Sequence, residues 1–364
     1  MPPHLRIKIG GVAVPWPVEA QTEVNNTRTA GTWSAGIAFL DRDPMNLAWW
    51  ATQSTLRVEI DASLNGQNFT TLMVGNADEV EITPNTNYVT LTGRDLTALL
   101  IDQKTAQTYQ NQTASEVATI LANGVGLTPM VTPTTVPVGL YYASNHTRMS
   151  MGDLARAVTS WDLLNFLADQ ENFDVFVSGT SLYFQPKQQA GGIPFQVNWS
   201  KVGGVVVSNV MNLQMKRSLT IAHDLSVEVQ SWNTALNREV TVKASSTANG
   251  TSATGPAQNY TFTKPNLTPA QAADYANQQL LALSRAERII TFDMPGELAL
   301  TPRSVLQLSG TNTPYDQLYY PDSITRSVQF RGGFKESVVA RNHSVTQQIA
   351  LAAGGGTEIS GLGF

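Results

Sequence analysis

The hydrophobic period of residues 150–186 changes once, from helical spacing to strand spacing, and this change is the most informative feature of the sequence. Five apolar residues recur at helical spacing and predict one amphipathic helix: Leu154, Val158, Trp161, Leu164 and Ala168. Ser150 to Asp153 is typical of a capping sequence and predicts the start of this helix. The period then becomes two on either side of a turn at residues 178–180, with apolar positions at Phe173, Val175, Val177, Leu182 and Phe184. The stretch therefore predicts a helix that runs directly into a tight β-hairpin.

The wider region, residues 94–203, shows the same mixture of helix and strand patterns. At its start, residues 89–103 predict a strand that leads into a helix. Residues 111–127 predict another helix, with a capping box from Thr113 to Glu116. The connector at residues 128–139 is expected to be extended, because its prolines forbid a helix.

The N-terminal region, Leu5–Leu91, alternates with a period of two and predicts an antiparallel meander. Gly10-Gly11 and Asn65-Gly66 are hairpin signals, and a polar turn is expected at Thr83–Asn87. Alternating strands joined by tight turns predict a barrel or a strongly bent sheet.

Strands return in the C-terminal part, at Val205–Lys243 and again at Arg288–Ala340. One alternating face of the last strands is apolar: Ile324, Val328 and Phe330. Between the two runs, Ser245–Asn259 has few apolar residues and predicts a flexible loop. Thr268-Pro269-Ala270-Gln271 then predicts the start of a helix, since it combines an N-cap residue, a first-turn proline and a glutamine that closes a capping box.

These patterns predict a fold of the α+β class that is mainly β, with two barrel-like domains and an intervening α/β domain. The expected divisions are residues 1–93 for the first β domain, 94–203 for the α+β domain, 204–345 for the second β domain with a loop-helix insertion at 245–286, and 346–364 for a Gly-rich C-terminal tail.

Four apolar residues are candidate contacts with partner proteins. Trp49 and Trp50 follow a proline-containing segment that predicts a loop. An exposed pair would anchor an interface, whereas a buried pair would close the barrel, and we expect at least one of the two in the core. Leu362 and Phe364 would anchor the C-terminal tail if it docks as a strand; the alternative is a disordered terminus.

The composition favours a structural protein that buries surface against neighbours. Charged residues make up only 14% of the chain, the net charge is −5, and neutral polar residues are abundant. Without a run of lysines and arginines, specific binding of nucleic acid is not expected. The absence of cysteine excludes disulfides, thiolate metal sites and thiol nucleophiles. We expect no signal peptide and no membrane anchor, and synthesis and assembly in a cytoplasm.

The motifs of enzymes and cofactor sites are weak in this sequence. None of the four histidines stands four residues from another, so no metal site is expected: His4, His146, His223 and His343. Gly124-Val125-Gly126 follows a helix and predicts its C-terminal cap instead of a dinucleotide site. Ser34, within Gly31–Gly36, is one residue out of step with a nucleophile elbow, and this segment predicts a loop between strands. We expect no enzymatic activity and no cofactor.

The order and spacing of these elements resemble the baseplate hub proteins of contractile-tailed bacteriophages. Two further segments contribute, RIITFDMPG at residues 288–296 and FRGGFKESVVARN at residues 330–342. The family includes the Mu-like tail protein P and the P2-like late control protein D, and the N-terminal half of type VI secretion spike proteins is related. The resemblance covers roughly Leu5 to Asn342.

The resemblance implies a structural hub at the virion tail baseplate. Two tube domains on each of three chains would form a pseudo-sixfold ring that joins the hexameric tail tube to a trimeric spike. Tape measure and baseplate wedge proteins would be further partners, and DNA would only pass through the lumen. The two β regions share no evident sequence identity, so their duplication is implied by the resemblance alone.

Two other functions remain open at this stage. Glu79 and Glu81 share one strand face, and Glu171 and Asp174 flank a helix end, so either pair could serve a glycan-binding or glycan-cleaving tail protein. Glu79 and Glu81 lie beside a polar turn, however, and are expected to face water. The other alternative is the hub of a DNA-free contractile injection particle.

Overall fold

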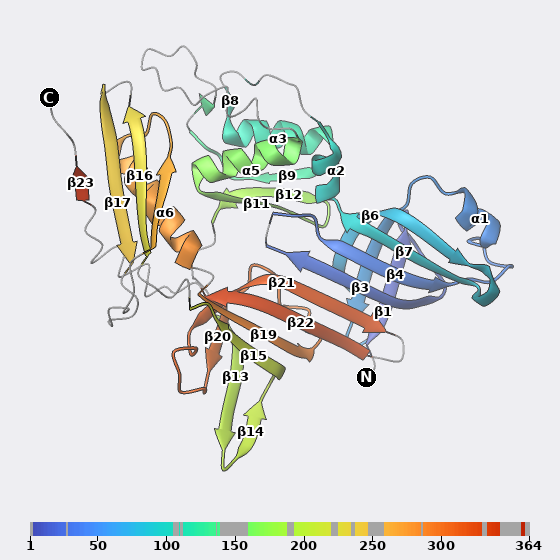
Figure 1. The fold of residues 1–364 in the computed structure, drawn as a ribbon. Helices are drawn as coiled ribbons and strands as arrows, with labels where there is room; N and C mark the ends of the chain where they lie inside the picture. The colour runs from blue at the N-terminus through green and yellow to red at the C-terminus, as the bar shows by residue number, and fades with distance from the viewer. Residues whose placement is uncertain are drawn as a thin grey trace.

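The computed structural model of the chain is mainly β, with short helices between and beside the strands (Figure 1). It describes residues 3–26, 28–104, 109, 112–135, 137–138, 159–187, 193–219, 225–233, 237–246, 258–284, 287–329, 333–342 and 358–360. Its strands form one sheet of 14 strands and three smaller sheets. The predicted α+β class, mainly β, is confirmed.

The N-terminal half of the large sheet is an antiparallel set of strands in the order β2-β1-β5-β6-β7-β4-β3. Their bounds are β1 (His4–Ile9), β2 (Val12–Ala13), β3 (Pro17–Asn25), β4 (Thr32–Ala38), β5 (Arg57–Ser63), β6 (Thr70–Thr83) and β7 (Tyr88–Asp95). Gly10 and Gly11 both have positive φ in the first hairpin, and a short 3-10 helix, η1 (Pro84–Thr86), makes the polar turn. The predicted turns of this region are confirmed.

One prediction for this half is wrong, because the segment Gly31–Gly36 is not a loop. Its residues from Thr32 onward form β4, which pairs with β3 on one edge and β7 on the other. A Cβ on Gly36 would lie 1.7 Å from the Tyr88 hydroxyl, and one on Gly31 would lie 2.9 Å from an Asp95 oxygen. These glycines therefore make room for neighbouring side chains and do not mark a turn.

The C-terminal half of the large sheet has the order β15-β19-β22-β21-β20-β13-β14. Its strands are β13 (Phe195–Val202), β14 (Val205–Ser208), β15 (Met211–Arg217), β19 (Arg288–Pro295), β20 (Leu306–Ser309), β21 (Leu318–Gln329) and β22 (Gly333–Asn342). Ile324 and Val328 are buried on one face as predicted, whereas Phe330 lies outside the described residues. β13 precedes the predicted boundary at residue 203, yet its pairing with β20 places it in this half.

The α+β region is a three-stranded sheet with the longer helices on one face (Figure 1). Its elements are α2 (Thr97–Asp102), β8 (Gln112–Thr113), α3 (Ala114–Gly124), β9 (Thr128–Val131), β10 (Pro137–Val138), α5 (Ser160–Glu171), β11 (Phe173–Ser178) and β12 (Ser181–Pro186). The hairpin β11–β12 has its predicted turn, and Trp161, Leu164 and Phe184 lie in one core. Gly126, with φ +75°, follows the end of α3, as predicted for a helix cap.

The structure describes α5 from its N-cap, Thr159. The expected start at residues 150–153 lies outside the described residues, and the observed N-cap is Thr159. Its hydroxyl accepts from the Asp162 amide at 3.1 Å, while Asp162 accepts from the Thr159 amide at 3.2 Å. We expect Thr159→Ala to lower the free energy of unfolding by about 1 kcal/mol, measured by urea denaturation. Thr180→Ala, on the exposed turn of the hairpin, is the control and should change it little.

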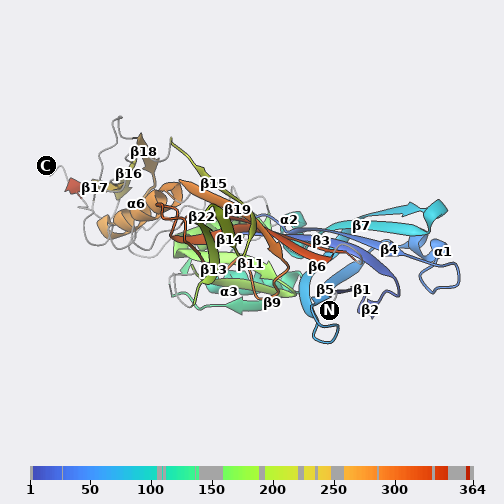
Figure 2. The same ribbon diagram turned by 90° about the horizontal axis from the view of Figure 1, so that it is seen from below.

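A separate small sheet with one helix is inserted between β15 and β19. The inserted elements are β16 (Leu225–Asn233), β17 (Arg238–Ser246), β18 (Gln258–Thr263) and α6 (Pro269–Ser284). A strand from the C-terminal end of the chain, β23 (Glu358–Ser360), pairs with β17 and completes the sheet. The insertion is larger than the predicted residues 245–286, since β16 and β17 share its core with α6. Thr268 and Gln271 cap α6 as predicted, and both ends of the predicted loop belong to strands. Figure 2 shows this unit at one end of the molecule and β4 and β7 at the other.

Candidate assembly surfaces

Within the described residues, one strand pair, β3 with β21, links the two halves into one sheet. The pairing is antiparallel and runs from Ser323 opposite Asn25 to Gln329 opposite Glu19. Val24 on β3 packs against the cores of both halves. The joint is therefore a continuous, packed part of the sheet (Figure 1).

The halves repeat one arrangement of strands. In the first half β3 pairs with β4, β4 with β7, β7 with β6 and β6 with β5, all antiparallel. In the second half β15, β19, β22, β21 and β20 pair in the same sequence and sense. The first hairpins depart from the repeat, because β1 is antiparallel to β5 whereas β13 is parallel to β20.

The repeat extends to single residues. β6 has a bulge between Ala77 and Glu79, and β21 has a bulge between Pro321 and Ser323, so an aspartate is the extra residue in each. Asp78 pairs with Arg94 at 2.8 Å on the neighbouring strand, and Asp322 pairs with Arg341 there. Arg94 stands opposite Asn76 and Arg341 opposite Tyr320, two residues before the respective aspartate. The two bulges and their ion pairs therefore have the same register.

A third equivalence follows one residue later. Asp95 accepts a hydrogen bond from the Gly31 amide at 2.9 Å, and Asn342 accepts one from the Arg288 amide, also at 2.9 Å. Burial raises the pKa of Asp95. The two halves share a short sequence signal at equivalent positions, Gly93-Arg94-Asp95 in the first and Ala340-Arg341-Asn342 in the second. The sequence alone did not reveal it, because only the arginine is identical.

The joint leaves two strand edges open in the described chain. β5 pairs with β6 only as far as Asn76, so the edge of β6 that follows, Asp78–Thr83, carries no strand within the described residues. β15 pairs with β19 on one edge and, in the same part of the chain, with no strand on the other. Open edges of this kind are surfaces for another chain.

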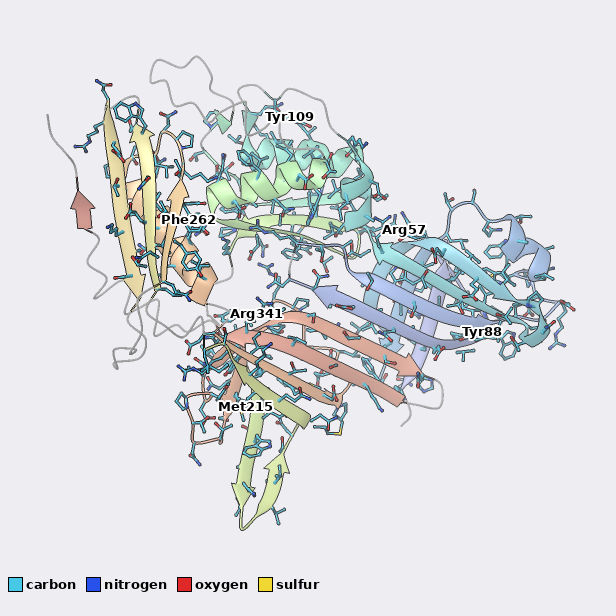
Figure 3. The ribbon with its side chains drawn as sticks, viewed as in Figure 1. Arg57, Tyr88, Tyr109, Met215, Phe262 and Arg341 are labelled. Atoms are coloured by element: carbon cyan, nitrogen blue, oxygen red, sulfur yellow. The ribbon has the colours of Figure 1, made fainter. Side chains whose placement is uncertain are left out.

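The hairpin β13–β14 carries a group of exposed apolar side chains. It projects from the second half (Figure 1), with Gly203 and Gly204 at its tip, both at positive φ. Exposed fractions are 66% for Val202, 66% for Val205, 52% for Val206 and 58% for Val207. Met211 and Met215, on the following strand β15, are exposed as well, and Figure 3 labels Met215. Exposed apolar side chains gathered on one hairpin are typical of a protein interface.

The tryptophan pair divides between core and surface. Both residues lie in a short helix, α1 (Leu47–Thr52), where a loop was predicted. Trp50 is 2% exposed and closes the first core, whereas half-buried Trp49 packs edge-on against it and lines a surface pocket with Leu56, Arg57 and Asn76. Of the two, only Trp49 reaches the surface. Leu362 and Phe364 lie outside the described residues, although β23, just before them, pairs with β17.

The candidate catalytic groups lie on strands and at a helix end, outside the core clusters. Glu79 and Glu81 are exposed on β6, as expected. Burial raises the pKa of Glu171, while Asp174 forms an ion pair with Arg303 at 2.7 Å. Ser34 lies within β4. The described residues hold no group of three or more histidine, aspartate or glutamate side chains placed to bind a metal ion.

Among the helices of the described residues, none combines the length and the apolar character that a membrane-spanning helix requires.

The fold is similar to those of solved phage tail proteins. The tail protein of Neisseria meningitidis MC58 superposes with a TM-score of 0.66 and 12% identity over 94% of this chain and 97% of that one. The 43 kDa tail protein of prophage MuSo2 from Shewanella oneidensis gives 0.64 and 14% over 92% and 97%. An E. coli type VI secretion component, itself similar to the T4 tail proteins gp27 and gp5, gives 0.54 and 10% over 93% and 77%. No protein-family model and no curated protein sequence match the chain. The fold implied by the sequence resemblance is confirmed.

Proposed function

We propose that this protein is the structural hub of a contractile tail baseplate. The observation that carries the proposal is the internal repeat, since one chain supplies two equivalent halves joined edge to edge. Three such chains offer six equivalent positions, which is the number needed beneath a hexameric tube. The likeness of the fold to phage tail proteins supports this role.

In this proposal the two halves are the tube domains, residues 1–93 and 204–345, with β13 added to the second. Residues 94–203, less β13, form the α+β domain that faces a trimeric spike, and residues 346–364 are the tail. The low charge of the chain suits a lumen through which DNA passes without binding. Tape measure and wedge proteins are the expected outer partners. The protein acts in the virion baseplate, is assembled in the host cytoplasm and has no enzymatic role.

Light scattering on the purified full chain tests the proposal. We expect a complex of three 39.4 kDa chains, formed either by the chain alone or once the candidate spike protein is co-expressed. Burial of the open strand edges and of the exposed valines of β14 would drive the association of the chains. A stable interface of at least about 1,000 Å² would cover both. A chain that stays monomeric with and without the spike protein contradicts the hub function.

A further inference from the structure

The two open edges correspond, strand for strand, to the two edges that meet in the joint. β21 uses its edge beyond the bulge at Asp322 to accept β3. The same edge of β6, beyond the bulge at Asp78, is open, and β15 is the repeat of β3. We propose that β6 of one copy pairs with β15 of a second copy, in the register of β21 with β3. This proposal rests on the proposed hub function.

The repeat fixes which residues would face each other. Thr325, three residues beyond its bulge aspartate, stands opposite Glu23 in the joint, and Glu81 is three residues beyond Asp78. Glu23 stands opposite Thr32, which on its other side stands opposite Arg94. In the second half, Lys216 stands opposite Ile289, which stands opposite Arg341, the equivalent of Arg94. Lys216 therefore takes the place of Glu23.

The resulting pair is Glu81 with Lys216 of the second copy. One position further along the strands, the same derivation places Ile82 opposite Met215.

The side chains at these positions are complementary. Glu79 and Glu81 are exposed on β6, and Lys216 is exposed on β15. Within the described residues, none of these three side chains forms an ion pair. Opposite residues of antiparallel strands project on the same face, so Lys216 would lie across from Glu81 and diagonal to Glu79. Half-buried Ile82 would meet Met215, whose exposed fraction is 39%.

The same charges select against other pairings. Two β6 edges brought together would place glutamates near glutamates, and two β15 edges would place Lys216 and Arg217 near their own copies. The interface is therefore head to tail, joining different surfaces of successive copies. Contacts of this type close into a ring when the rotation between copies permits it.

Cysteine pairs provide the test, since the natural chain contains no cysteine. Opposite Cα atoms in antiparallel strands lie about 4.5–5.5 Å apart, within the range that a disulfide bridges. We expect the full-length Glu81→Cys/Lys216→Cys variant to form covalent dimers and trimers on oxidation, seen on a denaturing gel without reductant. Glu81→Cys/Met215→Cys, which moves one cysteine to the other face of β15, is the matched control and should yield few covalent dimers and trimers.

Charge reversal gives an independent measurement by light scattering. Glu81→Lys alone and Lys216→Glu alone should each raise the protein concentration needed for trimer formation on the order of tenfold, and the double reversal should restore it. Glu239→Lys, at an exposed glutamate on β17, should leave assembly unchanged.

The two proposals fail in different ways. Trimers that form normally but do not cross-link between residues 81 and 216, and that tolerate each single reversal, would overturn the strand pairing and leave the hub function standing. Monomers under every condition would overturn both.

Discussion

Replacement of Arg326 by isoleucine is expected to lower the free energy of unfolding by about 3–5 kcal/mol. The Arg326 guanidinium lies 2.6 Å from the Glu336 carboxylate, and both side chains are buried. Glu336 also accepts from the Glu297 amide at 3.1 Å, and Arg326 donates to the Leu300 carbonyl. Without the arginine, a carboxylate remains in the core with one hydrogen bond. Urea denaturation at pH 7.5 measures the loss.

The first half of the chain supplies the matched control. Arg326 stands opposite Glu336 in the register where the first half places Ile82 opposite Val89. Arg326→Ile/Glu336→Val therefore rebuilds a pair that the repeat already uses. It should recover part of the loss, leaving about 1–3 kcal/mol, because the Glu297 amide and the Leu300 carbonyl lose their partners. A single variant as stable as the natural protein would contradict this account.

The cost of Arg326→Ile should also depend on pH. Burial raises the pKa of Glu336 above its ordinary value of 4.5, although Arg326 opposes the shift. A glutamate with a raised pKa binds its proton more tightly in the folded state, so its stabilising effect is present at low pH and is lost as the pH rises through that pKa. Removing Arg326 raises the pKa further. The loss should therefore be smaller at pH 5 than at pH 7.5, and an equal loss at both would argue against a buried, uncompensated carboxylate.

Trp33→Ala is expected to destabilise the first half by about 3–5 kcal/mol. Trp33 is 4% exposed, and its indole N–H donates to the Arg94 carbonyl at 3.2 Å. Its ring lies against two strand glycines, since a Cβ on Gly75 or Gly93 would stand within 2.6 Å of it. These two glycines have no side chain that could fill the space that the indole leaves. Thermal unfolding followed by circular dichroism measures the effect.

The control for Trp33 is Trp16, which is 48% exposed and donates to Asp43 at 3.2 Å. Trp16→Ala should change the free energy of unfolding by about 0.5 kcal/mol or less. Equal losses for the two variants would mean that the indole of Trp33 is not a principal part of this core.

Local signals in the sequence predicted much of the fold. The hairpin at residues 178–180 and the caps at Thr113 and Thr268 depend on residues close in the chain, and the structure has them. Gly31 and Gly36 misled us because their role is tertiary: glycines that admit Asp95 and Tyr88 have the same sequence signature as turn glycines. Pairings across the chain, such as β13 with β20, leave no local signal at all.

The candidate surfaces were harder to predict than the fold. Glu79 and Glu81 were correctly expected to face water, but only strand register gives them a partner strand. The repeat was hard to find in the sequence because equivalent positions of the two halves carry different residues. Trp33 stands opposite Gly93 where the second half has Ile290 opposite Ala340, so each half pairs a large residue with a small one while both identities differ. The sequence predicted that at least one of Trp49 and Trp50 is buried, and the orientation of α1 determines that it is Trp50.

The β3–β21 joint also determines the ratio of the two halves in a ring and the concentration dependence of ring assembly. Because both halves belong to one chain, they are always made in a one-to-one ratio, and their joint forms at an effective concentration on the order of millimolar however little protein the cell holds. In a ring of three copies, alternate joints are complete once each chain has folded. Only the others depend on collisions, so assembly scales with the third power of chain concentration and not the sixth.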